Sequence, residues 1–539
     1  MTETNALGQL TDVWEIAPAD NETVTVPFGE QNLTGYPTHY DYDTLGNLKQ
    51  VSQSTQPRSF VYDSLSRLTS ATNPEGGTVE YRYDANGNLV LKIDPRTHPA
   101  GFDLSTCSIP YTETKVATCF EYDSLNRVKS RTYNDGTPRV DLVYDTLPNG
   151  KGRLTSLGNS ASMYNVVSYD TLGRATASSQ TTGGVTYSMP DYHYNLAGGL
   201  TSEQYPSGKV VAVDYDSAGR LTGVRNQASN NFYAGAGAQS TDRVQYAPHG
   251  ATAALRLGNG LWEHAEFNER LQIVQIGLGT AVADSSKLQF DFNYGTNDNN
   301  GNLRSQSINV PGSLSLTQSY YYDPLNRLDI AREAKVTGGG EAEVWKQRFN
   351  YDRFGNRAFK SSETTDNVEG PQLSFGPASN RITTNGYDYD SAGNLTAAPN
   401  FTYQYDAENR MVTVNGGTGN PGGAVYAYDG GGRRVKKVTG LETTVYVYNV
   451  TGQLVAEYSN QVVGGGVSYL TQDHLGSTRV VTDVDGAPKS RHDYLPFGEE
   501  VRTDAVTDSG REGIVSYNPG SVRQKFTGYE RDNETGLDS

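Results

Sequence analysis

The sequence predicts an all-β protein built from repeated hairpins, and three observations support this. The chain has 539 residues, with 37 tyrosines and 59 glycines but only 15 Phe, 4 Met and 3 Trp. Tyrosine favours strands, glycine favours turns, and glycine in particular disfavours helices. Hydrophobic residues make up only 35% of the chain, which is low for a solid globular core. The third observation is a short motif that recurs along most of the chain.

The motif consists of an aromatic residue, any residue, Tyr and Asp. Two or three small or polar residues follow, and then Gly or Asn, Arg or Asn, and Leu. Neighbouring copies are often about 20 residues apart, as in YDYDTLGNLKQV at 40–51 and FVYDSLSRLTSA at 60–71. The fifteen motif tyrosines are Tyr42, Tyr62, Tyr83, Tyr122, Tyr144, Tyr169, Tyr194, Tyr215, Tyr294, Tyr322, Tyr351, Tyr389, Tyr405, Tyr428 and Tyr448.

Each copy predicts one β-hairpin. Aromatic residues two apart, such as Tyr40 and Tyr42, project from the same face of a strand. The following Asp ends the strand, because its carboxylate can accept backbone N–H bonds and start a turn. Gly or Asn then supplies the positive φ that the turn needs. These aspartates are Asp43, Asp63, Asp84, Asp123, Asp170, Asp216, Asp323, Asp352, Asp390, Asp406 and Asp429.

A single hairpin is barely stable in water, so the units are expected to pair edge to edge into a continuous sheet. Tyrosine suits a half-wet wall, since its ring packs while its hydroxyl reaches water or a polar partner. Unrelated β domains with common turns would not produce fifteen copies of one pattern.

Charge and hydropathy argue against some classes of protein. Lys and Arg total 44 against 61 Asp and Glu, a formal net charge of −17, which argues against a nucleic-acid binder. No run of eighteen apolar residues predicts a transmembrane helix. The start, MTETNALGQLTDVWEIAPADNE, shows no signal peptide. The protein is therefore cytosolic, exported without a cleavable signal, or a fragment.

The repeats, with these residues, resemble the YD repeats of the RHS family. YLTQDHLGSTRVVTDVDGAPKSRHDYLPFGEE at 469–500 and KFTGYERDNETGLD at 525–538 resemble the RHS repeat-associated core. The resemblance implies a β-sheet strip wound into a hollow shell, either complete or incomplete. In bacterial members the shell encloses a C-terminal polymorphic toxin, as the C component of Tc toxins does, and teneurins use a related shell for adhesion.

The predicted organisation has three parts. Residues 1–36 are lead-in strands, 37–460 the repeat array and 461–539 the core. By the same resemblance, the core helps to close the shell and includes an aspartyl autoprotease. The sequence stops before the family's cleavage motif and toxin, so cleavage by this chain alone is not expected. Arg531 and Asp532 are the candidates for that site; an ion pair or turn cap is the favoured interpretation for both.

Other candidate chemistry is weak. Asp473, His474 and Ser477 superficially suggest a triad, but a turn bending at Gly476 explains them better. TNDNNGN at 296–302 and TDVDGAP at 482–488 lack the distal Glu of a calcium loop, and the second is interpreted as a hairpin turn. No cofactor or metal site is predicted.

The sequence also supports structural predictions for four further segments. Cys107 and Cys119 are interpreted as small, half-buried hairpin residues, with a local disulfide as the alternative. Lys436 and Lys437, beside Arg433 and Arg434, are interpreted as a solvated strand edge. The divergent stretch 226–290 is not expected to be a separate domain, and 500–524 is expected to be a polar loop inserted in the core.

Three functions follow. The leading hypothesis is a structural shell that encapsulates and delivers a C-terminal toxin cargo absent from this chain, aided by a secretion or delivery apparatus. The second is a module that binds carbohydrate or cell-surface glycans through its aromatic faces. The third is the core autoprotease. The family resemblance implies a secreted or cell-surface location.

Overall fold

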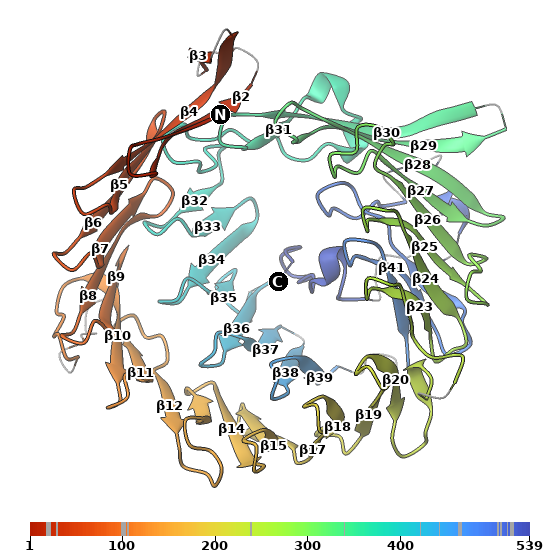
Figure 1. Ribbon diagram of the computed structural model, residues 1–539, viewed down its shortest axis with the longest axis horizontal. Helices are drawn as coiled ribbons and strands as arrows, with labels where there is room; N and C mark the ends of the chain where they lie inside the picture. Colours follow the sequence, from red (N-terminus) through yellow and green to blue (C-terminus); the bar gives the residue numbers. More distant parts are fainter. Residues whose placement is uncertain are drawn as a thin grey trace. The chain divides into compact units, whose positions relative to one another are not determined.

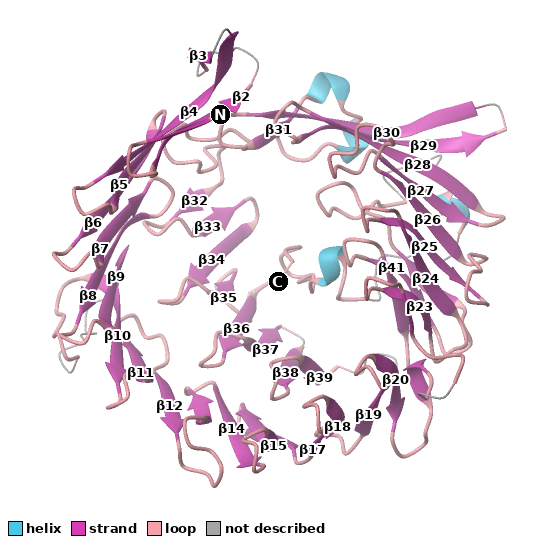
Figure 2. Ribbon diagram, in the orientation of Figure 1, coloured by secondary structure: helices cyan, strands magenta, loops and turns pink. Residues whose placement is uncertain are grey.

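The computed structural model describes most of the chain. The described residues are 1–17, 23–28, 31–98, 104, 107–237, 240–338, 340–420, 422–440, 442–461, 466–503, 506, 509–514, 516–517 and 522–538. Almost all regular structure in them is β-strand (Figure 2). The only helices in this part of the chain are four short 3-10 turns: η1 (Ser361–Glu363), η2 (Asp366–Val368), η3 (Arg511–Gly513) and η4 (Phe526–Gly528). The all-β prediction is confirmed.

The chain divides into two compact units, each built from segments distant in sequence. The first comprises Met1–Pro190, Tyr351–Arg357 and Gln372–Gln461. The second comprises Asp191–Asn350, Ala358–Pro371 and Val462–Ser539. The stretch 226–290 falls inside the second unit and forms no unit of its own, as expected. The boundaries drawn from the motifs, 1–36, 37–460 and 461–539, stay a prediction.

The first unit begins with a sixteen-stranded sheet. Its strands pair antiparallel in chain order, except that β3 pairs at the side of β4 (Figure 1). The strands are β1 (Thr2–Thr4), β2 (Leu10–Ile16), β3 (Val24–Phe28), β4 (Gln31–Tyr42), β5 (Leu48–Gln53), β6 (Gln56–Tyr62), β7 (Leu68–Asn73), β8 (Gly77–Tyr83), β9 (Leu89–Thr97), β10 (Lys115–Tyr122), β11 (Val128–Tyr133), β12 (Val140–Tyr144), β13 (Leu154–Gly158), β14 (Ser162–Tyr169), β15 (Ala175–Thr182) and β16 (Val185–Met189).

A second, eight-stranded sheet completes this unit and lies alongside the first (Figure 1). Hairpin ends of the first sheet hold it: the Gln180 side chain donates to the backbone oxygen of Tyr446 at 2.8 Å, and Asn159 donates to that of Tyr428 at 2.9 Å. Its strands are β32 (Asp388–Tyr389), β33 (Leu395–Ala398), β34 (Phe401–Tyr405), β35 (Met411–Val414), β36 (Ala424–Tyr428), β37 (Arg434–Thr439), β38 (Thr443–Tyr448) and β39 (Leu454–Ser459).

The second unit contains three sheets of five, ten and three strands, again in chain order. The five strands are β17 (Tyr192–Tyr194), β18 (Leu200–Gln204), β19 (Val210–Tyr215), β20 (Leu221–Asn226) and β21 (Phe232–Gly235). The ten are β22 (Gln245–Tyr246), β23 (Thr252–Arg256), β24 (Trp262–Phe267), β25 (Ile273–Gly279), β26 (Leu288–Asn293), β27 (Ser305–Val310), β28 (Leu314–Tyr322), β29 (Leu328–Thr337), β30 (Gly340–Tyr351) and β31 (Arg357–Phe359). The three are β40 (Tyr469–Gln472), β41 (Thr478–Thr482) and β42 (Pro488–Arg491).

Edge-to-edge pairing of successive hairpins is thus confirmed, but the strip is divided into separate sheets. The divisions fall where the sequence removes strand-forming residues. Pro190 follows β16, a Gly/Ala-rich stretch follows β21, and Pro371 and Pro377 lie between β31 and β32. Proline lacks the N–H that a ladder needs, and glycine weakens a strand.

Apolar cores are small and follow the strand alternation. In β27 alternate residues are buried, including Ile308 and Val310, which pack with Phe290 and Leu316 from the neighbouring strands. The core of the C-terminal region forms around Trp345 of β30, whose side chain is fully buried. Each such side chain stabilises the fold by about 1.5–3 kcal/mol on burial. No described helix is long and apolar enough to cross a membrane.

Two interpretations of the sequence were wrong. Cys107 and Cys119 are not half-buried thiols: both are buried and form a disulfide. Lys437 does not lie on a solvated edge, because β37 pairs on both sides, with β36 and β38, and Lys437 is only 5% exposed. Position within a sheet decided this burial, and a basic cluster alone does not reveal that position.

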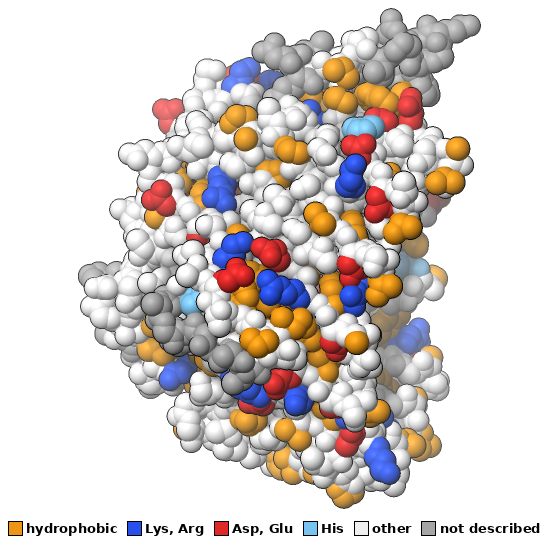
Figure 3. All heavy atoms as spheres, turned by 90° about the vertical axis from the view of Figure 1, so that its left-hand side faces the viewer, with side chains coloured by type: hydrophobic (Ala, Val, Ile, Leu, Met, Phe, Trp, Pro, Cys, Tyr) orange, Lys and Arg blue, Asp and Glu red, His pale blue; other side chains and the backbone are white. Residues whose placement is uncertain are grey.

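On the face of the first sheet seen in Figure 3, basic and acidic side chains lie interspersed with apolar ones. Mixed charge of this kind suits a solvated wall better than a surface of one sign.

Candidate functional site

The motif aspartates organise the turns as predicted. At Asp63, one carboxylate oxygen accepts the N–H of Leu65 at 2.9 Å and that of Arg67 at 3.0 Å, while the other accepts the Arg67 Nε at 2.7 Å. All eleven predicted aspartates accept the same pair of backbone bonds, at 2.8–3.0 Å. The backbone N–H of Arg67 is the main cause that lowers the pKa of Asp63, and burial opposes it.

The motif tyrosines join one repeat to the previous one. Nine of them donate from the hydroxyl to a backbone oxygen in the preceding repeat, at 2.5–3.1 Å; for example, Tyr83 donates to Leu68 and Tyr122 to Leu89. The nine are Tyr83, Tyr122, Tyr144, Tyr169, Tyr215, Tyr322, Tyr405, Tyr428 and Tyr448. The predicted polar partner of the hydroxyl is therefore the neighbouring hairpin.

The motif arginines complete this link. The Arg67 guanidinium bonds Asp63 of its own turn and lies 4.9 Å from the ring centroid of Tyr83 in the next repeat. Arg127 does the same with Asp123 and the Tyr144 ring at 4.3 Å. In these repeats one Arg side chain thus closes its own turn and contacts the next repeat.

Turns of the eight-stranded sheet are buried against the first sheet. Arg96 donates to the backbone oxygen of Asp406 at 3.0 Å, and the Ala407 N–H donates to the Thr137 hydroxyl at 2.9 Å. Gly430 lies so close to the first sheet that a Cβ there would come within 2.7 Å of a Val140 methyl. The predicted structural residues Asp406 and Asp429 are therefore buried, at 7% and 2% exposure.

The C-terminal core begins with a turn of the same kind. Asp473 accepts the N–H groups of Leu475 at 2.9 Å and Ser477 at 3.0 Å, and Gly476 has φ +81°. The predicted turn is confirmed. Asp473, His474 and Ser477 do not form a triad, since the Ser477 hydroxyl instead accepts the Thr527 N–H at 3.1 Å. A second hairpin turn, at Asp483–Gly486, joins β41 to β42 as expected.

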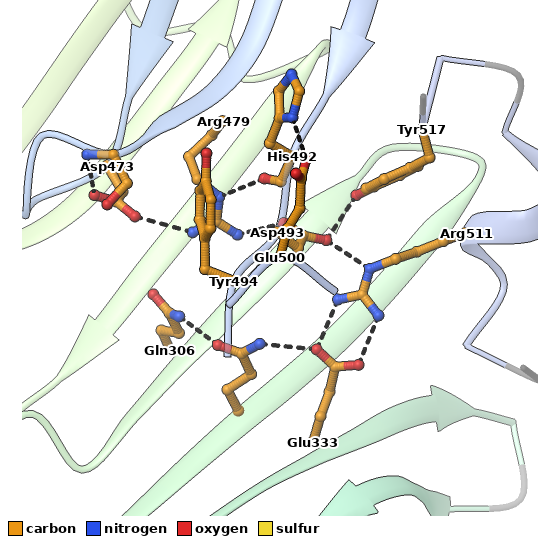
Figure 4. Close-up of polar contacts among 12 residues, drawn as sticks. Gln306, Glu333, Asp473, Arg479, His492, Asp493, Tyr494, Glu500, Arg511 and Tyr517 are labelled. Carbon is orange, nitrogen blue, oxygen red and sulfur yellow. Dashed lines mark hydrogen bonds and ion pairs between the residues drawn. The ribbon is translucent and has the colours of Figure 1, made fainter. Parts of the chain in front are cut away.

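A buried ion network ties this core to the ten-stranded sheet (Figure 4). Arg511 is fully buried and donates through both terminal nitrogens to Glu333 of β29, each at 2.7 Å. Its Nε donates to Asp493 at 2.6 Å. Arg479 bonds the other oxygen of Asp493 and donates to Asp473 at 3.1 Å.

Neutral groups satisfy the rest of the network. The Tyr517 hydroxyl donates to Asp493 at 3.0 Å, and Gln318 donates to Glu333 at 2.9 Å. Burial alone would raise the pKa of Asp493, but the charges of Arg511 and Arg479 hold that pKa well below its usual range. Burial and the Asp493 carboxylate together raise the pKa of Tyr517. Asp493 therefore stays ionised at neutral pH and keeps its contacts with both arginines.

A histidine in the same core has the surroundings of a catalytic base but is enclosed. His492 Nε2 lies 2.9 Å from the Ser490 hydroxyl, and Nδ1 lies 2.6 Å from Glu500. Ser490 and His492 are 0% and 1% exposed, so no substrate reaches the hydroxyl. Lys525 also bonds Glu500, at 2.7 Å, and the group is a structural clamp.

Arg531 and Asp532 lie in the last turn of the described chain. Arg531 forms two bonds of 2.8 Å with Asp538 and donates to the Gly498 backbone oxygen at 3.0 Å. Asp532 is 4% exposed, and its backbone closes the turn with Leu537. These contacts fit the ion-pair and turn interpretation. No described group of three or more His, Cys, Asp or Glu side chains could hold a metal ion.

Two family descriptions match the chain. Residues 62–98 match "RHS Repeat", and residues 261–508 match "Teneurin YD-shell", which reaches from the ten-stranded sheet into the core. Both lie where the repeat geometry is seen. Over these residues the chain is similar to RHS/YD-repeat proteins.

The curated proteins that the chain resembles carry toxin names. It is 25% identical over 422 residues to the Double-stranded DNA deaminase toxin A of Burkholderia cenocepacia, covering 75% of this chain and 26% of the relative. It is 26% identical over 214 residues to the tRNA3(Ser)-specific nuclease WapA of Bacillus spizizenii, covering 35% of this chain and 9% of the relative. The chain thus spans about a quarter of the first relative and about a tenth of the second.

The fold is shared with solved structures. A crystal structure of TcdB2-TccC3-TEV aligns over 99% of this chain and 29% of its own, with TM-score 0.73 and 15% identity. The Photorhabdus luminescens Tc holotoxin pore aligns over 98% and 28%, with TM-score 0.71 and 14% identity. At these identities the likeness establishes the fold, which is the one expected from the repeats.

Sequence reasoning missed the ion network of the C-terminal region. Arg511 lies in the stretch 500–524, interpreted as a polar loop, and the described part is indeed irregular but holds the fully buried Arg511. Its partner Glu333 is 178 residues away. No local pattern signals such a pair.

Proposed function

We propose that this chain is the shell portion of an RHS polymorphic toxin, which encloses and delivers a C-terminal toxin domain that would follow residue 539. The observation that carries the proposal is the anchoring of the C-terminal region to the repeat sheet by Arg511, Glu333 and Asp493. A segment that continues from this region starts at a fixed point on a YD-repeat wall. The toxin names of the relatives support the same function.

The disulfide supports the proposed location. Disulfides persist in oxidising environments, and Cys107–Cys119 lies in the repeat array. We therefore propose a secreted or cell-surface protein, exported by a dedicated apparatus.

A protection experiment tests the shell. A reporter enzyme is fused after residue 539 and, as the matched control, before residue 1. Enclosure predicts that proteinase K degrades the N-terminal reporter much faster than the C-terminal one. Equal rates of degradation would reject enclosure.

A second candidate function is autoproteolysis of a longer chain, with Asp532 and Arg531 contributing. It is favoured by the near-complete burial of Asp532 in a turn beside the end of the chain. The test extends the chain with the coding sequence that follows and compares Asp532→Asn with Asp485→Asn, a change in an exposed hairpin turn. Equal cleavage in both variants would remove Asp532 from the mechanism.

A further inference from the structure

Arg491 is a buried arginine with no hydrogen-bonded carboxylate among the described residues, and burial lowers its pKa although the charge of nearby Asp493 opposes this. It ends β42 and is 6% exposed. Its Nη2 donates to the Lys287 backbone oxygen at 3.3 Å, while Nε and Nη1 are buried and have no hydrogen-bond partner in the described chain. Because two of its three nitrogens lack an acceptor, most of its hydrogen-bonding capacity is unused.

The other buried arginines of the core are treated differently. Arg511 contacts Glu333 and Asp493, and Arg479 contacts Asp473 and Asp493. A guanidinium stays protonated in proteins, so burial cannot neutralise Arg491. A buried charge without a partner strongly disfavours the fold, and such groups in native proteins are normally paired. The structure therefore calls for an anion beside Arg491.

A pocket of about 630 Å³ opens at this point. Arg491, Arg502 and Arg531 line it, together with Glu499, Glu500 and Tyr517. Glu500 already bonds His492, and Tyr517 bonds Asp493 (Figure 4). Glu500 also bonds Lys525. Arg531 is itself ion-paired with Asp538, so the arginine nitrogens on this wall that lack an acceptor are those of Arg491.

We propose that this pocket binds a carboxylate through Arg491. A planar guanidinium matches a carboxylate in shape and in hydrogen-bonding direction. Glu499 and Glu500 on the same wall disfavour a doubly charged group such as phosphate.

The carboxylate can come from two sources. One is an Asp or Glu of a segment following Asp538, since Arg531 lines the pocket and is ion-paired with Asp538. This source rests on the proposed function. The other is a free small organic acid, which does not.

The test uses the chain as it is and acetate as the probe. Thermal unfolding is followed in sodium acetate and in sodium chloride at equal ionic strength. A ligand that binds only the folded state raises Tm, here by about 2–4 °C near saturation. Arg491→Met should abolish the acetate-specific shift, whereas the control Arg523→Met, which removes a partly exposed arginine of the same core, should retain it. An equal shift in wild type and Arg491→Met, or none in wild type, would overturn the proposal.

Two further measurements keep the test decisive if Arg491→Met alters folding. Thr503→Glu places a carboxylate on the pocket wall and should raise Tm without acetate and remove the acetate effect. Line broadening of ¹³C-acetate should occur with wild type and disappear with Thr503→Glu. Broadening that persists unchanged would place acetate elsewhere and reject the pocket.

Extension of the chain past residue 539 with its natural coding sequence identifies the source. Loss of the acetate effect would assign the site to the following segment, and its retention to a free acid. Either result is independent of reporter protection, so failure of the carboxylate site and failure of the shell are distinguishable.

Discussion

The repeat array and the C-terminal core differ in how far apart in the sequence their paired charged residues lie. In the array each aspartate closes its own turn, and Asp63 bonds only groups within four residues. In the core, Arg511 and Glu333 meet across 178 residues and are fully buried. The array therefore spreads its stability over many similar local contacts, whereas the core concentrates it in one network. A single loss should be tolerated in the first and disruptive in the second.

The largest loss of stability is expected from a substitution in the buried ion network of the core. Glu333→Gln removes the carboxylate that Arg511 contacts with both terminal nitrogens and leaves a buried charge undercompensated. We expect a loss of about 3–5 kcal/mol in the free energy of unfolding. Denaturant unfolding followed by Trp345 fluorescence measures it, because Trp345 lies on the neighbouring strand.

The matched control is Glu341→Gln. Glu341 lies on the strand that pairs with β29, is about half exposed, and approaches Arg332 only at 3.9 Å. Exposed pairs contribute little, so unfolding should be unchanged within error. A similar loss in both variants would contradict the view that burial of the network matters.

Glu263 on β24 sharpens the comparison, because this partly buried acid has no ion-pair partner among the described residues. Its Oε1 has no hydrogen-bond partner among the described residues, and burial raises its pKa to about 7. The unfolded value is near 4.3, so the folded state holds the proton longer. Stability from this group is complete below about pH 4 and is lost as the pH rises through about 7.

Glu263→Gln should remove this pH dependence. We expect the variant to be more stable than wild type at pH 8 by about 1–3 kcal/mol and close to it at pH 4. Thermal unfolding with Trp262 fluorescence, from the same strand, measures both. Glu266→Gln on β24, where the side chain is exposed, is the control. A pH profile identical to wild type in Glu263→Gln would reject the raised pKa.

The array could be predicted from the sequence and the core could not, for a physical reason. The turn at Asp63 needs only residues within four positions, so the Tyr-Asp motif and its Asn or Gly contain the whole geometry. Contacts between distant segments leave no such pattern. The pair Arg511–Glu333, the buried Lys437 and the docking of Asp406 on Arg96 depend on which strands become neighbours.

The hydrogen bonds from the motif tyrosines to the preceding repeat could be predicted only in part from the sequence. A ring on a wet wall implied a polar partner for the hydroxyl, but the partner is a backbone oxygen one hairpin earlier, such as Leu68 for Tyr83. The recurring Arg was a signal that could have shown the link, because a cation beside an aromatic ring is a common contact.

A smaller loss of stability is expected when the motif aspartate is removed, and its size should differ between a buried and an exposed turn. Asp429→Ala removes the cap of a turn buried against the first sheet and leaves Arg433 without its carboxylate. We expect a loss of about 1–3 kcal/mol. Asp63→Ala removes the same bonds from an exposed turn, where water replaces them, and should cost less.

Amide hydrogen exchange distinguishes the two turns. Protection should fall at Gly431 and Arg433 in Asp429→Ala and extend into β36 and β37, while in Asp63→Ala the change should stay within Leu65 and Arg67. The isosteric Asp→Asn variants keep one acceptor and serve as controls. Equal spread of the loss in both turns would show that docking on the first sheet adds nothing.

The smallest expected effect comes from removing the tyrosine hydrogen bond between neighbouring repeats. Tyr83→Phe removes the hydroxyl that donates to Leu68 at 2.8 Å and keeps the ring under Arg67. One net hydrogen bond is worth about 0.5–1.5 kcal/mol. Because each repeat contacts mainly its neighbours, the losses from Tyr83→Phe, Tyr122→Phe and Tyr169→Phe should add. Tyr321→Phe, where the ring is exposed, should be neutral. Thermal unfolding of the three single variants and of the triple variant tests this additivity. If the triple variant loses much less stability than the sum of the three single losses, the hydrogen bonds are not independent and the repeats unfold as one cooperative sheet.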